Sequence, residues 1–104
     1  MDEKIIEISF NIISNAGGAK GLAFEAIREA KAGNIESARE KLVESKDTMV
    51  KAHRFQTELI QNEAIGNKTE MSVILVHAQD HLMNAMTFQQ LAEEFIDLYE
   101  RIEK

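Results

Sequence analysis

The sequence predicts an all-α protein, an antiparallel three-helix bundle, on three observations. Proline is absent from the 104 residues. Apolar residues recur every three or four positions through three long segments, which is the spacing of one face of a helix. Two Gly-Asn pairs, Gly33-Asn34 and Gly66-Asn67, separate these segments. Each helix would have roughly 30 residues and a length of ~45 Å, and the short turns make neighbouring helices antiparallel. Clusters of β-branched and aromatic residues between turn signals are missing, so we expect no strands.

The first segment, residues 2–32, carries a broad apolar face interrupted by glycines. Its two adjacent seams are Ile5, Ile8, Ile12, Ala19, Leu22 and Ala26, and Ile6, Ile13, Ala16, Ala23, Ile27 and Ala30. Gly17, Gly18 and Gly21 lie within this face, and each costs about 1 kcal/mol relative to alanine in a helix. They mark either a close approach of helices or a local kink, or else room for a group that docks against the backbone.

The second segment begins after Gly33-Asn34, where glycine suits the end of one helix and asparagine the N-cap of the next. Its single seam is Ile35, Ala38, Leu42, Ser45, Met49, Ala52, Gln56 and Leu59. The polar amide of Gln56 on this stripe is either a device that sets the register or a hydrogen-bond partner for a site on another helix. His53, three residues earlier, is typical of an exposed or boundary histidine.

The third segment follows Gly66-Asn67, where Asn67 and Glu70 resemble a capping box. One of its seams is Ile74, His77, His81, Asn84, Phe88, Leu91, Phe95, Leu98 and Ile102, and the other is Val73, Val76, Asp80, Met83 and Thr87. The two seams are about 60° apart on a helix. Two apolar seams are more than the partners within one chain can cover. We therefore expect a homo-oligomer in which the Asp80 seam of each third helix faces a symmetry axis.

Composition limits the class of protein. The length suits one domain spanning residues 1–104. A net charge of −6 with scattered lysines and arginines argues against nucleic acid as a partner. Cysteine is absent, so the chain offers neither a disulfide nor a thiolate nucleophile. The start Met1-Asp2-Glu3-Lys4 is not a signal peptide, and no apolar run approaches the ~20 residues of a membrane span. These features predict a soluble, cytoplasmic protein.

Two of the three histidines and one aspartate gather in an apolar run of the third segment. His77, Asp80 and His81 are three and four residues apart, so they share one side of about one helical turn. Imidazole and carboxylate groups on an apolar helix cost free energy unless they are paired, bind a metal or serve a function. We therefore expect the function to reside here.

From the residues alone, several interpretations of this cluster stay open. His77 and His81 could be hydrogen-bonded boundary residues, with Asp80 a solvated charge. A zinc enzyme would use the two histidines, but Ala78 stands where the H-E-x-x-H pattern has its catalytic glutamate. A two-component-type histidine phosphotransfer bundle would have a lysine at the position of Asp80. A non-catalytic helical oligomer bridged by a metal is a further alternative.

A family resemblance favours another interpretation. The run Val76-His77-Ala78-Gln79-Asp80-His81-Leu82-Met83 closely resembles the signature of the lactose/cellobiose-type IIA components of the bacterial phosphoenolpyruvate-dependent sugar phosphotransferase system. The likeness extends over the whole chain, including residues 15–20 with 26–33 in the first segment and residues 52–60 in the second. The resemblance implies three-helix subunits that assemble into a nine-helix homotrimer, with a divalent metal on the threefold axis.

The resemblance also implies a function and roles for residues. The chain would be a phosphotransferase component that acts only within its multiprotein system. It would accept phosphate on His77 from the histidine phosphocarrier protein and pass it to the cysteine of a IIB component. The IIC membrane permease would then deliver a β-linked disaccharide such as cellobiose, lactose or chitobiose for phosphorylation. His81 would line the active site, Gln79 is a further candidate there, and Asp80 would bind the axial metal, expected to be Mg²⁺.

The chemistry of these residues agrees with that function. A neutral imidazole is a good nucleophile near pH 7, and His81, one turn along, can donate a hydrogen bond to a phosphoryl oxygen. The acceptor cysteine must come from a partner, because this chain has none. Three Asp80 carboxylates converging on an apolar axis would repel one another unless they bind a cation or hold protons. A hard divalent ion such as Mg²⁺ suits such oxygen ligands.

Overall fold

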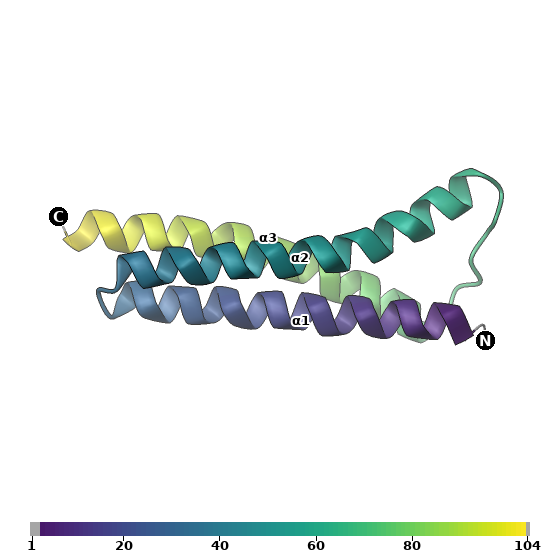
Figure 1. Cartoon of the computed structure of the whole chain (residues 1–104), viewed down its shortest axis with the longest axis horizontal. Helices are drawn as coiled ribbons and strands as arrows, with labels where there is room; N and C mark the ends of the chain where they lie inside the picture. Colours follow the sequence, from purple (N-terminus) through teal and green to yellow (C-terminus); the bar gives the residue numbers. More distant parts are fainter. Residues whose placement is uncertain (1–2, 104) are drawn as a thin grey trace.

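The computed structural model describes residues 3–103, which form three long helices and no strand within that range. Helix α1 spans Glu3–Lys31, α2 spans Ile35–Ala64 and α3 spans Val73–Glu103. They lie side by side along one axis, with α2 antiparallel to α1 and α3 (Figure 1). This arrangement confirms the predicted three-helix bundle and the helix lengths of 29, 30 and 31 residues. The predicted helix start at Asp2 lies outside the described residues.

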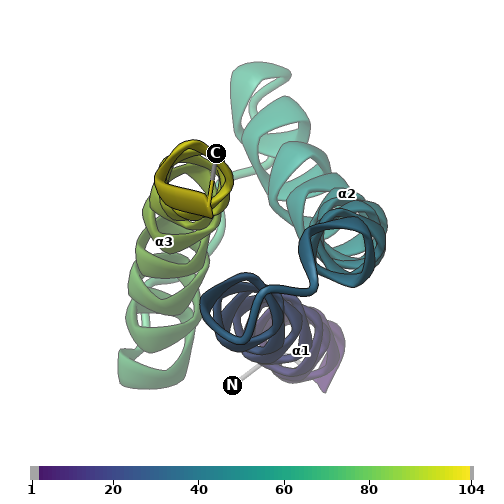
Figure 2. The same ribbon diagram turned by 90° about the vertical axis from the view of Figure 1, so that its left-hand side faces the viewer.

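The core is narrow because alanine supplies much of it. Seen along the bundle, the helices form the corners of a triangle, and α1 contacts both of the others (Figure 2). One apolar cluster is built around Ile12 and Leu82 and a second around Leu42 and Ile96. Alanines fill much of the space between these larger residues, namely Ala16, Ala19, Ala23, Ala26, Ala30, Ala38, Ala52, Ala78, Ala85 and Ala92. Such small side chains let the helix backbones approach closely.

The predicted buried face is confirmed for α2 and broadly for α1. The buried residues of α2 are Ala38, Leu42, Ser45, Met49, Ala52 and Leu59. In α1 they come from both predicted seams, with Ser9 added: Ile8, Ser9, Ile12, Ala16, Ala19, Ala23, Ala26 and Ala30. The first two helices therefore pack with the faces that their apolar periodicity indicates.

The prediction for α3 was wrong in its choice of face. Its buried residues form a third stripe, consisting of Leu75, Ala78, Leu82, Ala85, Ala92 and Ile96. His81 lies at the half-buried edge of this stripe, whereas Val73 and Val76 are exposed. The sequence of α3 is apolar on three sides. The side that packs inward combines three alanines, which allow a close approach of helices, with larger residues that fill the two core clusters.

Both Gly-Asn pairs close the helix that precedes them. Gly33 and Gly66 have φ angles of +93° and +97°, a left-handed conformation that glycine adopts without strain. The N–H of Gly66 donates to the Glu63 carbonyl and that of Asn67 to the Asn62 carbonyl. The same pair of bonds recurs at Gly33 and Asn34. This is the Schellman pattern, in which orphan carbonyls at the helix end are satisfied.

The predicted capping box at Asn67 and Glu70 was therefore wrong. Asn67 serves the end of α2, and α3 begins only at Val73. The Leu75 N–H donates to the Ser72 hydroxyl oxygen at 3.3 Å, so Ser72 is the N-cap of α3. Asn34 does precede α2 as predicted, but its side chain does not cap that helix. Its amide donates instead to the Glu29 carboxylate.

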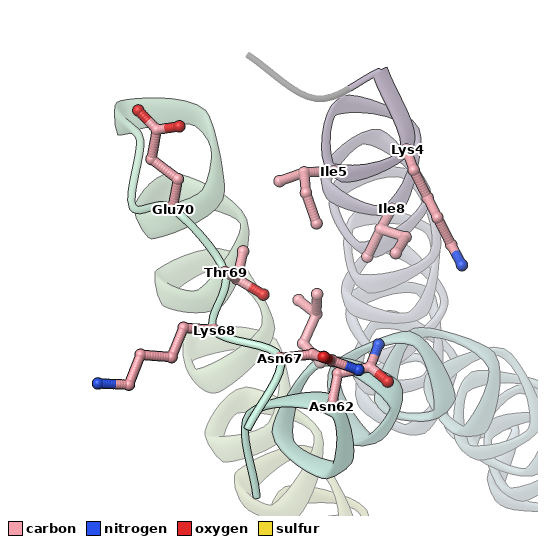
Figure 3. A pocket seen from close by; sticks show the side chains of 9 residues that line it. Lys4, Ile5, Ile8, Asn62, Asn67, Lys68, Thr69 and Glu70 are labelled. Atoms are coloured by element: carbon pink, nitrogen blue, oxygen red, sulfur yellow. The ribbon is translucent and has the colours of Figure 1, made fainter. Parts of the chain in front are cut away.

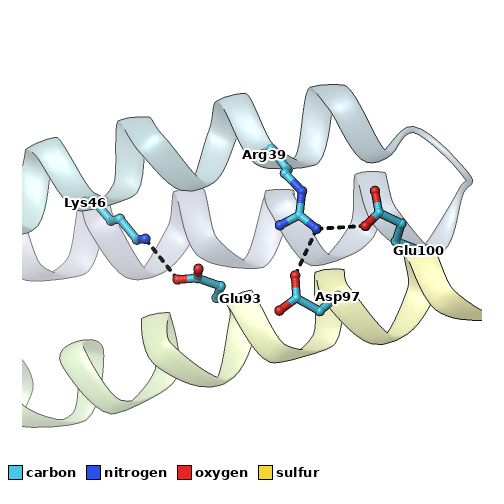
Figure 4. Close-up of polar contacts among 5 residues, drawn as sticks. All are labelled: Arg39, Lys46, Glu93, Asp97 and Glu100. Carbon is cyan, nitrogen blue, oxygen red and sulfur yellow. Dashed lines mark hydrogen bonds and ion pairs between the residues drawn. The ribbon is translucent and has the colours of Figure 1, made fainter.

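Ion pairs join α2 to α3 in the half of the bundle away from the histidines (Figure 4). The Arg39 guanidinium donates to the carboxylates of Asp97 at 2.8 Å and Glu100 at 3.3 Å. The Lys46 ammonium donates to Glu93 at 2.9 Å. The hydrogen bond that Arg39 donates to Asp97 is the largest of the effects that raise the pKa of Arg39 above its ordinary value. Because these ion pairs are partly exposed, each contributes little to the stability of the bundle.

Candidate functional site

Two imidazole rings lie in parallel near the start of α3. His77 and His81 have ring centroids 5.8 Å apart and ring planes inclined by 14°. The i,i+4 spacing on a helix brings the rings together, as the sequence predicted. His77 is exposed, whereas His81 is half-buried at the edge facing α1. The pair thus combines one accessible imidazole with one that is held by its surroundings.

Helix α1 provides the surface against which His81 lies. A Cβ atom added at Gly17 would lie 3.2 Å from Nε2 of His81. The imidazole edge therefore sits against bare backbone, in a space that a side chain at Gly17 would narrow. For Gly17, this agrees with the expected close approach of two helices, with the His81 ring in the space that the missing side chain leaves. A Cβ atom added at Gly18 would instead lie 3.7 Å from the Thr48 methyl group. One added at Gly21 would meet no atom within 4 Å.

Asp80 lies on the neighbouring face of α3, which is exposed. One of its carboxylate oxygens accepts a hydrogen bond from the Asn84 amide at 3.3 Å. Along the same face, the exposed fractions of Val73, Val76 and Met83 are 87%, 52% and 44%. A lone carboxylate thus interrupts a row of uncovered apolar side chains.

The fit of Asp80 to a divalent metal depends on other copies of the chain. A carboxylate is the ligand type that Mg²⁺ prefers. Each chain supplies one such group on this face, and within residues 3–103 no cluster of three or more His, Cys, Asp or Glu side chains could hold a metal ion. The residues fit a metal only where several copies of Asp80 converge.

Gln79 lies on a different side of α3 from the histidine pair of its own chain. Its Oε1 accepts a hydrogen bond from Nε2 of Gln56 at 2.6 Å, which joins α3 to α2. Gln56 is therefore a hydrogen-bond partner between helices, but its partner is Gln79 and not a histidine. His53 is exposed and lies beside Thr57, as expected for a surface histidine.

Two cations of α1 that the sequence analysis did not single out lie over aromatic rings. The Lys20 ammonium lies 5.8 Å from the centroid of the Phe88 ring, and Arg28 lies over Phe24 at 5.7 Å. The two phenylalanine rings lie together, with centroids 4.4 Å apart. One signal was present in the sequence, because Lys20 follows Gly17 by three residues and so shares its face of α1.

A cavity of about 460 Å³ lies elsewhere, between the start of α1, the end of α2 and the following loop (Figure 3). Its lining consists of Lys4, Ile5, Ile8, Leu59, Asn62, Asn67, Lys68, Thr69 and Glu70. None of the candidate site residues is among them. His77 and Asp80 lie instead on the exposed surface of α3.

Comparison with known proteins identifies the family of the chain. The family described as "PTS system, Lactose/Cellobiose specific IIA subunit" matches residues 7–100. The lichenan-specific phosphotransferase enzyme IIA component of Bacillus subtilis (strain 168) is 54% identical over 102 residues, covering 98% of this chain and 93% of that protein.

Solved structures agree in fold. The cellobiose-specific enzyme IIA from Bacillus anthracis has a TM-score of 0.95 at 52% identity, covering 99% of this chain and 94% of that one. The IIA(Chitobiose)–HPr complex of Escherichia coli gives a TM-score of 0.85 at 36% identity, covering 99% and 100% of the two chains.

The fold and the histidine-bearing helix thus define a helical component of a sugar phosphotransferase system. More narrowly, the chain belongs to the lactose/cellobiose-specific IIA family. None of the helices in residues 3–103 is long and apolar enough to cross a membrane.

Proposed function

We propose that this chain is a phosphohistidine carrier that accepts a phosphoryl group on His77 and passes it to a cysteine of a IIB component. The observation that carries the proposal is the exposed His77 ring, stacked on a His81 ring that is itself seated against Gly17. One imidazole is open to a partner protein while its neighbour is held in place to assist.

In each of the two transfers, one bond to phosphorus forms while another breaks. A ring nitrogen of His77 attacks the phosphorus of a phosphohistidine donor, forming one N–P bond while the donor's N–P bond breaks. The acceptor thiolate then attacks the same phosphorus, forming an S–P bond as the bond to His77 breaks. Such transfers depend mainly on in-line positioning and charge stabilisation. His81 would contribute to both the positioning and the charge stabilisation, because it can donate a ring N–H to a phosphoryl oxygen.

The donor we propose is HPr, the histidine phosphocarrier protein. A solved relative is the IIA(Chitobiose) component in complex with HPr, and its fold covers 99% of this chain. The net charge of −6 favours a partner with a basic face. The IIB component would supply the cysteine, and the IIC permease would deliver the sugar from the membrane to this cytoplasmic relay.

We further propose that three chains assemble through the exposed apolar face of α3 into a nine-helix homotrimer. Val73, Val76 and Met83 would then be covered, and three copies of Asp80 would meet near the axis. Those carboxylates would hold a divalent metal, with Mg²⁺ as the expected ion, which would supply charge neutralisation. Gln79 would reach a phosphoryl group only from a neighbouring subunit, because in its own chain it bonds to Gln56.

The sugar we propose is a β-linked disaccharide of the cellobiose type. The names of similar proteins support this class, since they specify lichenan, cellobiose and chitobiose. The partner proteins would determine which sugar is bound, because this chain exchanges phosphate with proteins and not with sugar.

The test is the intact mass of the chain after incubation with phosphoenolpyruvate, the first enzyme of the system and HPr. We expect wild type to gain one phosphoryl group of about 80 Da, acid-labile and base-stable, and His77→Ala to gain none. The absence of a gain in wild type would contradict the proposal. It would favour the metal-bridged oligomer or a signalling phosphotransfer bundle, neither of which predicts rapid uptake from HPr.

A further inference from the structure

We propose that Lys20 is the cation that contacts the phosphoryl group carried by His77. This inference rests on the proposed function and adds a residue of α1 to the site. A phosphoryl group brings up to about two negative charges at neutral pH. Neither His77 nor His81 provides a permanent positive charge, and the chain as a whole is acidic with a net charge of −6. A nearby ammonium would stabilise the transferred group.

Lys20 lies on α1 between two contacts that this helix makes with α3. Gly17 faces His81, and one heptad further along each helix Phe24 faces Phe88. The two helices run in the same direction (Figure 1), so Lys20 lies between these two contacts, about 4.5 Å along the axis from Gly17.

A change of side-chain rotamer would bring the Lys20 ammonium from Phe88 toward the histidines. Side chains on a helix tend to lean toward its N-terminus, and in that direction the stem of Lys20 would cross the turn that contains Gly17. Gly17 has no side chain to block that turn, and the edge of His81 lies directly across from it. Gly17 therefore places the edge of His81 about one turn before Lys20 on the facing helix.

The ammonium of Lys20 is also available for a new contact. Its helical neighbours three and four residues away are Ala16, Gly17, Ala23 and Phe24, none of them acidic. Within residues 3–103, Lys20 takes part in none of the ion pairs, which engage other cations: Lys4, Arg39, Lys41 and Lys46. Its one recorded partner is the Phe88 ring at 5.8 Å.

The cation–π contact with Phe88 is suited to hold the Lys20 ammonium while His77 carries no phosphoryl group. An ammonium over an aromatic ring at a partly exposed site is held only weakly. A phosphoryl oxygen forms a charge-assisted hydrogen bond, which is shorter and stronger. Lysine acts on phosphate as a mobile point charge on a flexible stem. Lys20 would therefore leave Phe88 when His77 is phosphorylated and return when the group is passed on.

Single-turnover phosphoryl transfer from phospho-HPr tests the inference, with three variants of the full chain. Lys20→Met keeps the stem and removes the charge, Lys20→Arg keeps a charge, and Lys31→Met removes a charge from the far end of the same helix. We expect transfer to His77 to slow roughly tenfold or more in Lys20→Met. Lys20→Arg should recover part of the rate, and Lys31→Met should match wild type.

The phosphorus-31 resonance of the phosphorylated chain provides a readout that a structural role would not move. It should shift in Lys20→Met, return toward the wild-type position in Lys20→Arg and stay unchanged in Lys31→Met. Equal rates and resonances in Lys20→Met and wild type would overturn the inference. So would a higher KM for HPr with an unchanged rate constant for transfer, because Lys20 would then only dock the partner. If wild type itself accepts no phosphate, the proposed function fails, which is a separate result.

Discussion

The two histidines differ in exposure, and this difference supports the different tasks that we propose for them. His77 is open to solvent, whereas His81 lies half-buried with its Nε2 edge toward the backbone at Gly17. A nucleophile that meets two partner proteins in turn must be accessible. A group that orients the phosphoryl oxygens benefits from a fixed ring, because less conformational freedom is lost when it binds.

Alanine variants of the two histidines should therefore behave differently. We expect His77→Ala to fold normally and to accept no phosphate. His81→Ala should accept phosphate on the order of tenfold to hundredfold more slowly, since one hydrogen-bond donor to the phosphoryl group is lost. Rates of transfer from phospho-HPr measure both effects, with His53→Ala as a control because His53 lies on the surface of α2. Complete loss in both variants would contradict this division of tasks.

A substitution at Gly17 should separate stability from activity. Alanine in a helix is favoured over glycine by about 1 kcal/mol, but the new Cβ would lie 3.2 Å from His81 Nε2 and would displace the ring. We expect Gly17→Ala to melt at or slightly above the wild-type temperature while it transfers phosphate more slowly. Gly21→Ala is the matched control, since its Cβ would meet open space. A normal rate in Gly17→Ala would show that the position of His81 is not critical.

At the scale of the helices, α3 has more apolar surface than the bundle uses. The stripe with Ala78, Ala85 and Ala92 packs inward, while larger side chains such as Val73 and Met83 stay outside. This choice turns His81 toward α1 and Asp80 away from the core. The position of the site on α3 thus follows from which of its sides approaches α1 most closely.

The start of α3 depends on a cap that can be removed. Ser72 accepts a hydrogen bond from the Leu75 N–H, and His77 lies little more than one turn further along. We expect Ser72→Ala to lower the free energy of unfolding by about 1 kcal/mol, because an amide at the helix N-terminus loses its partner. Chemical denaturation measures this change. Ser72→Asp should keep the stability, since aspartate is an equally good N-cap; equal stability of Ser72→Ala and wild type would rule out the cap.

At the scale of the whole molecule, one chain leaves an apolar face uncovered. The bundle measures 54 × 20 × 17 Å, and exposed apolar side chains run along α3 from Val73 to Ile102. Exposed apolar surface of this extent commonly marks a contact with another protein. Asp80 lies within it, so the proposed assembly must either neutralise or solvate this carboxylate.

The variant Asp80→Leu tests the proposed assembly. Three leucines in place of three carboxylates remove the repulsion on the axis and add apolar contact. We expect Asp80→Leu to remain trimeric when a chelator removes divalent metal, whereas wild type should dissociate more readily under the same treatment. Light scattering after size-exclusion chromatography gives the mass. Asp47→Leu, at an exposed position of α2, is the control and should behave as wild type; an unfolded monomeric Asp80→Leu would contradict the axial position of Asp80.

Most local features could be predicted from the sequence because they depend on residues that are close along the chain. The three helices, the breaks at Gly33 and Gly66, and the stacking of His77 on His81 follow from periodicity, backbone preference and i,i+4 spacing. The octapeptide around His77 also indicated the family, which the comparisons confirm.

Features that depend on which surfaces meet could not be predicted in this way. Periodicity indicated two apolar seams of α3, whereas close packing with the alanine side of α1 buries a third stripe that the sequence analysis did not identify. That selection seats His81 on Gly17 and pairs Gln56 with Gln79. Sequence spacing determined which residues share a helix face. Tertiary packing decided which face is buried, because burial in a close-packed core depends on the shape of a face as well as on its hydrophobicity.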